Sequence, residues 1–240
     1  MATAIYHVLN RGVDKRKIFL DDQDRYRFIH DLYEFNDQNS AGNLNHFIKK
    51  QKNSDVGRPN IEVGNLMSQR REKRKLLVDV LVFCLMRNHY HLMLRERVPR
   101  GIPLFMKKLN GGYAKYFNEK YKRAGALFQG KYKSVLVVDD AHFVHLPYYI
   151  HLNPLDFNAP EWRERKLDNY KEAIKFLGSY RWSSHLDYCG RKNFPSVTNR
   201  SLLASFFGGT EQYEKHTLEW LKDFDQEEIR QVALESHEAH

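Results

Sequence analysis

Two histidines separated by a single residue are the first groups in the chain that could do chemistry. His89 and His91 lie in "MRNHYHLML", residues 86–94, directly after the apolar run "LLVDVLVFCLM". In a β-strand, residues two apart point to the same face with about 7 Å between their Cα atoms, so both imidazoles can converge on one metal ion. A proton-transfer pair and two structural histidines are alternatives that remain open, because 12 histidines in 240 residues make such a pair common by chance.

Further along the chain, "PYYIHLNPL", residues 147–155, places a tyrosine one helical turn from an asparagine. Tyr149 and Asn153 are four residues apart, so they lie on one face of a helix. The tyrosine offers a phenolic nucleophile, and the asparagine offers a carbonyl oxygen that can bind a hard cation. Tyr148 is the rival nucleophile, but Leu152, four residues beyond it, provides no ligand. For any one of the 14 tyrosines, a place in the core is the ordinary alternative.

Apolar periodicity predicts the elements that must position these side chains. In chain order we expect a strand, a helix, two strands of a hairpin, a helix, a strand and a final helix, which is the ferredoxin-like βαββαβ pattern with one added helix. The predicted class is therefore α+β, an antiparallel sheet with an added helix that carries Tyr149. The strands are expected at 4–10, 76–86, 89–96 and 131–138, and the helices from Asp21 or Asp22, over 103–123, and from Asp139 or Asp140 to Asn153.

The strand that carries the two histidines is expected to divide its side chains between two environments. Tyr90, Leu92 and Leu94 share one face and should pack against the helices, because they are apolar. His89 and His91 share the other face, which we expect to be the side that a substrate can approach.

Residues 1–155 are predicted to form the domain that holds these candidates, and residues 156–240 a helical C-terminal extension with an acidic amphipathic tail. Within the first domain, the basic segment 40–75 is expected to be an insertion with little core of its own. Pro147 lies inside the last predicted helix of that domain and is expected to kink it or to begin a new one. Pro154 should end the helix at Asn153.

The charge of the chain is basic and unevenly distributed. The net charge is +9, but residues 211–240 contain nine acidic and three basic residues, so the first 210 residues carry +15. A body this basic favours polyanions, above all nucleic acid, through release of counterions. Two distant cysteines, no leader pattern and no apolar run near the ~18 residues needed to span a bilayer predict a soluble, cytoplasmic protein without a membrane partner.

Basic and aromatic residues alternate between positions 113 and 133, as they do in proteins that bind single-stranded DNA. Tyr113, Tyr116 and Tyr121 are interleaved with lysines, whose charges can follow phosphates while aromatic rings stack on unpaired bases. Because Tyr116 is also a candidate for the core, the lysines are the firmer prediction. The residues predicted to contact DNA are Arg11, Lys107, Lys108, Lys115, Arg123, Lys131 and Lys133.

Several motifs, taken in order, resemble one known family. They are "YHVLNRGVDKRKIF", "LMRNHYHLML", "LNGGYAKYFNEKYKRAGALFQGKYKSVLV", "YIHLNP" and "YRWSSHLDY", within residues 4–190. Together they are similar to the single-tyrosine HUH transposases, and most of all to the REP-associated tyrosine transposases. The U of HUH is a hydrophobic residue between the two histidines, here Tyr90. Arg87 departs from the family, which often has a proline before the Asn-His pair.

The resemblance implies that His89 and His91 bind a metal ion, that Asn153 is its third, polar ligand and that Tyr149 is the nucleophile. Two imidazoles and a carboxamide suit Mg²⁺ or Mn²⁺. The implied activity is that of a metal-dependent endonuclease and strand transferase, which acts on single-stranded hairpin or palindromic DNA through a 5′-phosphotyrosine intermediate. Both a monomer and a homodimer are compatible with the sequence.

Two other functions share parts of this signature. A replication-initiator or relaxase-like nickase would use the same chemistry at a replication or plasmid origin. A domesticated descendant would bind hairpin DNA without cutting it. The presence of all four candidate residues counts against this last hypothesis.

Overall fold

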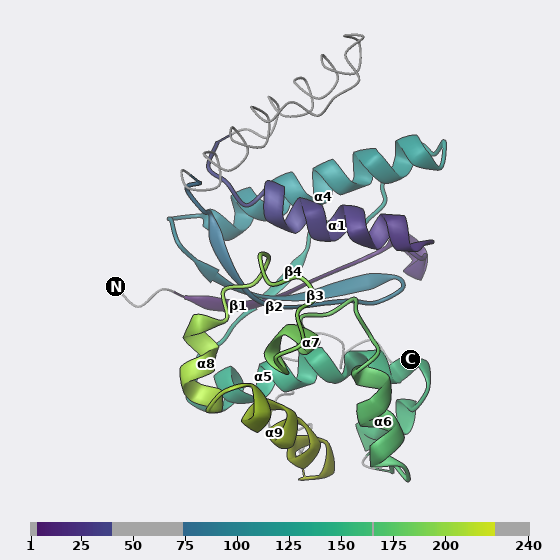
Figure 1. Ribbon diagram of the computed structural model, residues 1–240. Helices are drawn as coiled ribbons and strands as arrows, with labels where there is room; N and C mark the ends of the chain where they lie inside the picture. Colours follow the sequence, from purple (N-terminus) through teal and green to yellow (C-terminus); the bar gives the residue numbers. More distant parts are fainter. Residues whose placement is uncertain (1–3, 40–73, 165, 224–240) are drawn as a thin grey trace, which may run out of the picture.

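Four antiparallel strands form the central layer of the molecule, which the computed structural model describes over residues 4–39, 74–164 and 166–223 (Figure 1). The order across the sheet is β2-β3-β1-β4, and every neighbouring pair is antiparallel. The predicted α+β class and the βαββαβ order are confirmed. The strands are β1 (Ile5–Arg11), β2 (Val78–Leu85), β3 (His89–Glu96) and β4 (Lys133–Leu136).

One face of the sheet is covered by α1 (Asp22–Glu34) and α4 (Gly101–Lys120), which lie side by side (Figure 1). The short helix η1 (Val13–Lys15) precedes them. The sequence places the start of α1 correctly, because the side chains of Asp21 and Asp24 each accept a hydrogen bond from the other residue's backbone in a capping box. Gly112 lets α4 approach the end of α1, since a Cβ at that position would clash with the Phe35 ring.

The opposite face is covered by the helix that carries Tyr149 and by the C-terminal helices (Figure 1). The helix α5 (Asp140–Leu152) begins at Asp139, whose side chain accepts a hydrogen bond from the backbone N–H of His142 at 2.7 Å. It runs through Pro147 as one helix, and Asn153 follows it as the C-terminal cap. The later elements are η2 (Asn153–Phe157), η3 (Pro160–Glu164), α6 (Tyr170–Leu177), α7 (His185–Tyr188), α8 (Ser201–Phe207) and α9 (Thr210–Asp223).

Residues on both sides of the predicted boundary at 155 share one hydrophobic cluster. Met93 of β3 and Leu152 of α5 are buried in it together with Leu203 of α8 and Trp220 of α9. The acidic amphipathic tail predicted from residue 211 therefore includes a helix whose apolar side is part of the core. The division into two domains remains a prediction. The predicted basic insertion, 40–75, lies outside the described residues except for its last two positions.

No helix in the described ranges is long and apolar enough to cross a membrane.

Candidate active site

The strand β3 divides its side chains as the alternation predicts. Tyr90, Leu92 and Leu94 are buried in the cluster that includes α1 and α4, while His89 and His91 lie on the face that α5 covers. The expectation that this second face is open to a substrate is wrong for the structure as it stands. His91 is fully buried and His89 is only 7% exposed, because α5 packs directly onto β2 and β3.

The hairpin that presents the histidines is held from several sides. The backbone N–H of Met86 donates to the carbonyl of His89 at 2.9 Å, and the N–H of Gly12, just after β1, donates to the carbonyl of Asn88 at 2.8 Å. Arg87, at the position where the resemblance would put a proline, stacks its guanidinium over the Phe157 ring at 4.6 Å from the centroid. The substitution thus links the hairpin to the segment that follows α5.

A third histidine, His7 of β1, completes the cluster. In the pairing of β1 with β3, His7 is opposite Met93 and Leu9 is opposite His91, so His7 lies on the same face as both candidate ligands. His7 is fully buried, its Nε2 lies 2.9 Å from Nδ1 of His91, and the two rings are stacked. Sequence reasoning missed this residue, because the register that brings β1 beside β3 is a long-range feature. The only local signal was a histidine within the apolar first part of the strand, residues 5–9.

The two adjacent tyrosines of α5 point to different environments. Tyr149 faces the sheet, where its ring lies edge-on to His91 and His7 with centroids 6.1 Å and 6.2 Å away. Tyr148 faces the C-terminal helices and stacks on Tyr213 with centroids 4.9 Å apart. Burial raises the pKa of Tyr148 above its usual value, which disfavours the phenolate there. Of the two tyrosines, the structure brings Tyr149 to the histidines.

Asn153 lies one turn beyond Tyr149 and is fully buried. Its carbonyl oxygen accepts a hydrogen bond from Nη2 of Arg163 in η3 at 2.7 Å. The same guanidinium is held by the Asp156 carboxylate through Nε and Nη2, at 2.8 Å and 2.7 Å. It also lies over the Tyr149 ring, 5.6 Å from the centroid. Arg163 is a second residue that sequence reasoning missed.

A buried polar network anchors α5 from its other side. His151 lies 2.6 Å from the hydroxyl of Tyr213 and 2.8 Å from that of Ser184. The Ser184 hydroxyl in turn accepts from the backbone N–H of Phe83 in β2 at 3.0 Å. Burial lowers the pKa of His151 well below its ordinary value, so the ring is neutral and links α9, α5 and the sheet through hydrogen bonds. The motif "YRWSSHLDY" therefore positions α5.

The tautomers that this geometry favours suit metal binding by the two histidines of β3. Nδ1 of His89 lies 2.7 Å from the Asn88 side-chain oxygen, which can only accept, so the His89 lone pair is on Nε2. Nδ1 of His91 can donate to His7 in the same way, as metal-bound histidines generally donate their other ring N–H to a neighbour. The buried Nε2 atoms of His89 and His91 are therefore suitable ligands.

The third expected ligand fits less well, because the Asn153 oxygen is engaged by Arg163. Across the parts of the chain that the structure describes, no group of three or more His, Cys, Asp and Glu side chains is arranged to hold a metal. A divalent ion at this site would rest on His89 and His91.

Three of the residues predicted to contact DNA lie on or beside the histidine face of the sheet. Arg11 is opposite His89, and Lys133 is opposite Leu9, which is itself opposite His91. Lys133 is exposed, and so is Lys131, two residues before it. Arg11 and Lys133 thus lie on β1 and β4 on the histidine face, where they can meet the DNA backbone.

The other predicted DNA contacts lie elsewhere. Lys107, Lys108 and Lys115 are on α4, across the sheet from Tyr149. Lys108 donates to the backbone carbonyls of residues 37 and 39, and burial lowers its pKa. Arg123, just after α4, donates to the Asn118 side chain at 2.9 Å.

The aromatic residues of α4 are less available for base stacking than the sequence suggests. Tyr113 is fully buried and donates its hydroxyl to the carbonyl of Ile18 at 2.6 Å, so it belongs to the core.

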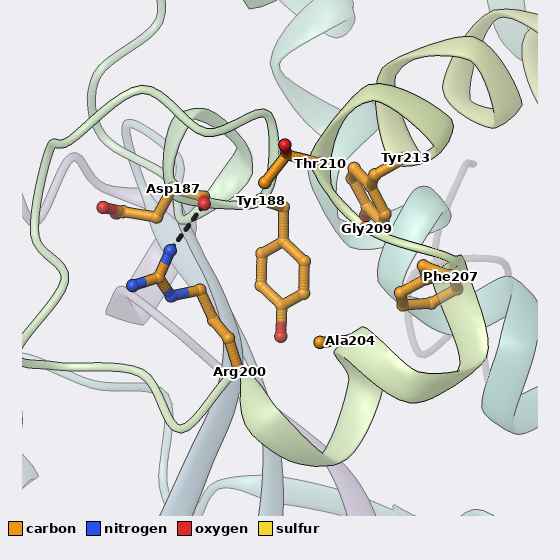
Figure 2. A pocket seen from close by; sticks show the side chains of 8 residues that line it. All are labelled: Asp187, Tyr188, Arg200, Ala204, Phe207, Gly209, Thr210 and Tyr213. Carbon is orange, nitrogen blue, oxygen red and sulfur yellow. Dashed lines mark hydrogen bonds between the residues drawn. The ribbon is translucent and has the colours of Figure 1, made fainter.

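Two cavities lie away from these residues. One, of about 90 Å³, is formed among α7, α8 and α9, where Tyr188 and Tyr213 line it and Arg200 donates to the backbone carbonyl of Asp187 (Figure 2). It is far smaller than the ~300 Å³ or more of an ordinary ligand pocket. The other, of about 280 Å³, lies between the end of α1 and residues 196–199. Neither is lined by His89, His91 or Tyr149.

Two comparisons with known proteins give a match. Residues 56–153 match the family described as "Transposase IS200 like". No curated protein is significantly similar to the chain in sequence. Among solved structures, the chain is similar to a REP-associated tyrosine transposase bound to a REP hairpin, with 11% identity and a TM-score of 0.43 over 84% of this chain and 91% of that one. This second likeness is too weak to assign a substrate.

The matched segment contains both histidines of β3 and Tyr149, and it ends at Asn153. His7 and Arg163 lie outside it. The likeness to the IS200-like transposases is thus a match to one segment of the chain, residues 56–153.

Proposed function

We propose that the protein cuts and rejoins single-stranded hairpin DNA by transesterification, with Tyr149 as the nucleophile. One observation carries the proposal: the Tyr149 ring lies against His91 and His7 on the sheet face that also holds His89. A phenol beside a potential metal ligand, His91, is an arrangement suited to phosphoryl transfer to tyrosine. The hairpin as substrate rests on the motifs that resemble REP-associated tyrosine transposases and on the basic charge of the first 210 residues.

In the reaction, the phenolic oxygen of Tyr149 attacks the scissile phosphorus and loses its proton. The bond from phosphorus to the 3′-oxygen breaks, and that oxygen takes up a proton to become a free 3′-hydroxyl. The product is a 5′-phosphotyrosine bond, which keeps the energy of the phosphodiester. Attack by a 3′-hydroxyl then reverses the step or joins a new strand, so rejoining needs no ATP.

His89 and His91 would hold Mg²⁺ or Mn²⁺ through their Nε2 atoms. His7 would orient His91 by accepting a hydrogen bond from its Nδ1–H. A bound ion would supply Lewis-acid chemistry, polarising the scissile phosphate and stabilising the leaving oxygen. Asn153, the third ligand that the resemblance implies, has its oxygen 2.7 Å from Arg163. The proposal therefore rests on the two histidines.

Access to the nucleophile requires movement, because Tyr149 is only 1% exposed. Two side chains of η3 lie against its ring: Trp162, with centroids 6.5 Å apart, and Arg163. DNA can reach the phenol when these side chains move aside.

The test is to incubate the protein and Mn²⁺ with a single-stranded hairpin labelled at either end and to look for a covalent adduct on a denaturing gel. A 5′-phosphotyrosine intermediate retains the 3′-labelled fragment on the protein and releases the 5′-labelled one. Cleavage without an adduct would contradict the tyrosine mechanism. Binding without cleavage would favour a domesticated hairpin-binding protein, and cutting confined to origin-like sequences would favour a replication-initiator or relaxase-like nickase.

A further inference from the structure

The side-chain amide of Asn153 is satisfied at only one end. Its oxygen accepts from Arg163, and a guanidinium can only donate, so the orientation of the amide is determined by its partner. Nδ2 of Asn153 is buried and has no acceptor among the residues that the structure describes. Buried donors in native proteins are nearly always paired, and an exception calls for an explanation such as a ligand.

The group that could complete this hydrogen bond must be an acceptor, and the surroundings favour an anion. The Arg163 guanidinium lies beside the amide, and its side chain is 27% exposed, so it connects the buried amide to the surface. The carboxylate of Asp156 is engaged by Arg163 and by the indole N–H of Trp162 at 2.8 Å. The Asn153 Nδ2 donor thus lies next to a positively charged guanidinium, and an amide N–H beside a positive charge favours a phosphate oxygen as the acceptor.

The position of this pair relates it to the proposed nucleophile. Asn153 is one helical turn beyond Tyr149 on the same face of α5, and Arg163 lies over the Tyr149 ring. A phosphate that meets the amide would therefore be close to the phenol.

We propose that Asn153 donates its amide N–H to a phosphate oxygen of the DNA strand and is a phosphate contact rather than the third metal ligand. Arg163 is the positioning residue: it holds the Asn153 oxygen and thereby turns Nδ2 toward the phosphate. The inference rests on the proposed function, because it takes the phosphate to be that of bound single-stranded DNA.

Two measurements separate a phosphate contact from a metal ligand. The first is the affinity for a fluorescent single-stranded hairpin in EDTA, where no divalent ion contributes. The second is the rise in melting temperature that Mn²⁺ produces without DNA. For Asn153→Ala we expect about 10-fold weaker hairpin binding in EDTA, since a hydrogen bond to a charged group is lost, and an unchanged Mn²⁺ effect. The reverse pattern, with affinity kept and the Mn²⁺ effect reduced, would overturn the inference. His89→Ala is the control that should lose the Mn²⁺ effect.

Asn153→Asp is the control for a folding defect in Asn153→Ala. It keeps the shape of the side chain and its contact with Arg163 while removing the N–H donor. We expect hairpin binding by this variant to stay weak with and without Mn²⁺. A metal ligand would behave otherwise, since a carboxylate binds the ion at least as well as a carboxamide, and Mn²⁺ would restore wild-type affinity. That restoration would also overturn the inference.

The role of Arg163 is tested by Arg163→Lys, which keeps the positive charge but loses the planar fork. We expect it to weaken hairpin binding in EDTA about as much as Asn153→Ala, and the double variant to be no weaker than either single variant, because the two residues act through one contact. Fully additive losses would contradict a positioning role. Lys166→Ala removes an exposed charge from the same segment and measures the loss caused by charge alone. None of these affinities depends on adduct formation, so a failure of the proposed nucleophile would remain distinguishable.

Discussion

The ring of Tyr149 stands edge-on to the imidazole of His91, with centroids 6.1 Å apart and an angle of 89° between the planes. Its neighbour Tyr148 instead lies nearly parallel to the ring of Tyr213, at an angle of 16°. Because successive residues of a helix are rotated by about 100°, two adjacent and chemically identical phenols point into different environments, one at the histidine face and one in the core formed with α9.

This contrast predicts opposite outcomes for two minimal substitutions. Tyr149→Phe removes only the phenolic oxygen, so the covalent adduct should be abolished while hairpin affinity stays within about twofold. Tyr148→Phe should retain the adduct, because Tyr148 faces the C-terminal helices. Gel detection of the adduct, with binding measured by fluorescence anisotropy, decides between them. If only the Tyr148 variant lost the adduct, Tyr148 and not Tyr149 would be the nucleophile.

The histidine cluster predicts graded losses of metal binding. His89→Ala and His91→Ala should each remove the Mn²⁺-dependent rise in melting temperature, since stabilisation by a ligand requires its site in the folded state. His7→Gln should weaken Mn²⁺ binding about 10- to 100-fold without removing it, which is the usual effect of losing a partner of a metal ligand. Equal stabilisation of the wild type and the His89 variant would contradict the site.

The positions of the lysines predict which of them contact the DNA. Lys133 lies on the histidine face of the sheet and Lys131 two residues before it. Replacing both with alanine should flatten the slope of log K against log[salt] by about 1.4, at about 0.7 for each single-strand phosphate contact. Lys107→Ala with Lys115→Ala removes the same charge from α4, across the sheet, and is the matched control. If the Lys107 and Lys115 double variant flattened the salt dependence as much as the Lys131 and Lys133 double variant, the DNA would contact α4 as well.

The buried His185 predicts a loss of stability in mild acid. Burial first, and then the charge of Arg191, lowers the pKa of this residue to about 4. Between about pH 6.5 and 4 the unfolded chain therefore binds a proton that the folded chain does not, and stability falls as the pH falls. His185 alone should contribute about 3 kcal/mol of loss over this range, at 1.36 kcal/mol per pKa unit. Urea denaturation at several pH values should show a shallower dependence for His185→Gln than for the wild type.

The packing of α9 predicts that the protein tolerates truncation up to the end of this helix and loses stability when the helix itself is removed. Deleting residues 211–240 removes Tyr213, whose hydroxyl pairs with His151, together with the buried Trp220 and Leu221. The loss of two large aromatic side chains lowers the free energy of unfolding by several kcal/mol. The truncated protein should therefore be unfolded at room temperature or bind no hairpin. Truncation after residue 223 keeps all of α9 and is the control. A stable, hairpin-binding protein ending at residue 210 would show that α9 does not support α5.

Much of the local structure was readable from the sequence, because it depends on residues close together in the chain. Asp21 and Asp139 begin their helices through bonds to backbone groups only three residues away. Alternation along β3 assigned Tyr90 and His91 to opposite faces, since the side chains of a strand alternate whatever the strand is paired with. The four-residue spacing of Tyr149 and Asn153 follows from helix geometry in the same way.

Only the tertiary structure decided what those faces meet. His7 joins the site because β1 pairs with β3 in one register, and a shift of one residue would turn it to the other side of the sheet. Arg163 reaches Asn153 and Tyr149 because η2 and η3 follow α5 and pack together, with η2 also in contact with α5 and α6. The sequence determined which groups could do chemistry, through local geometry. Long-range packing determined that these groups are buried, which partner holds each of them and which tyrosine faces the histidines.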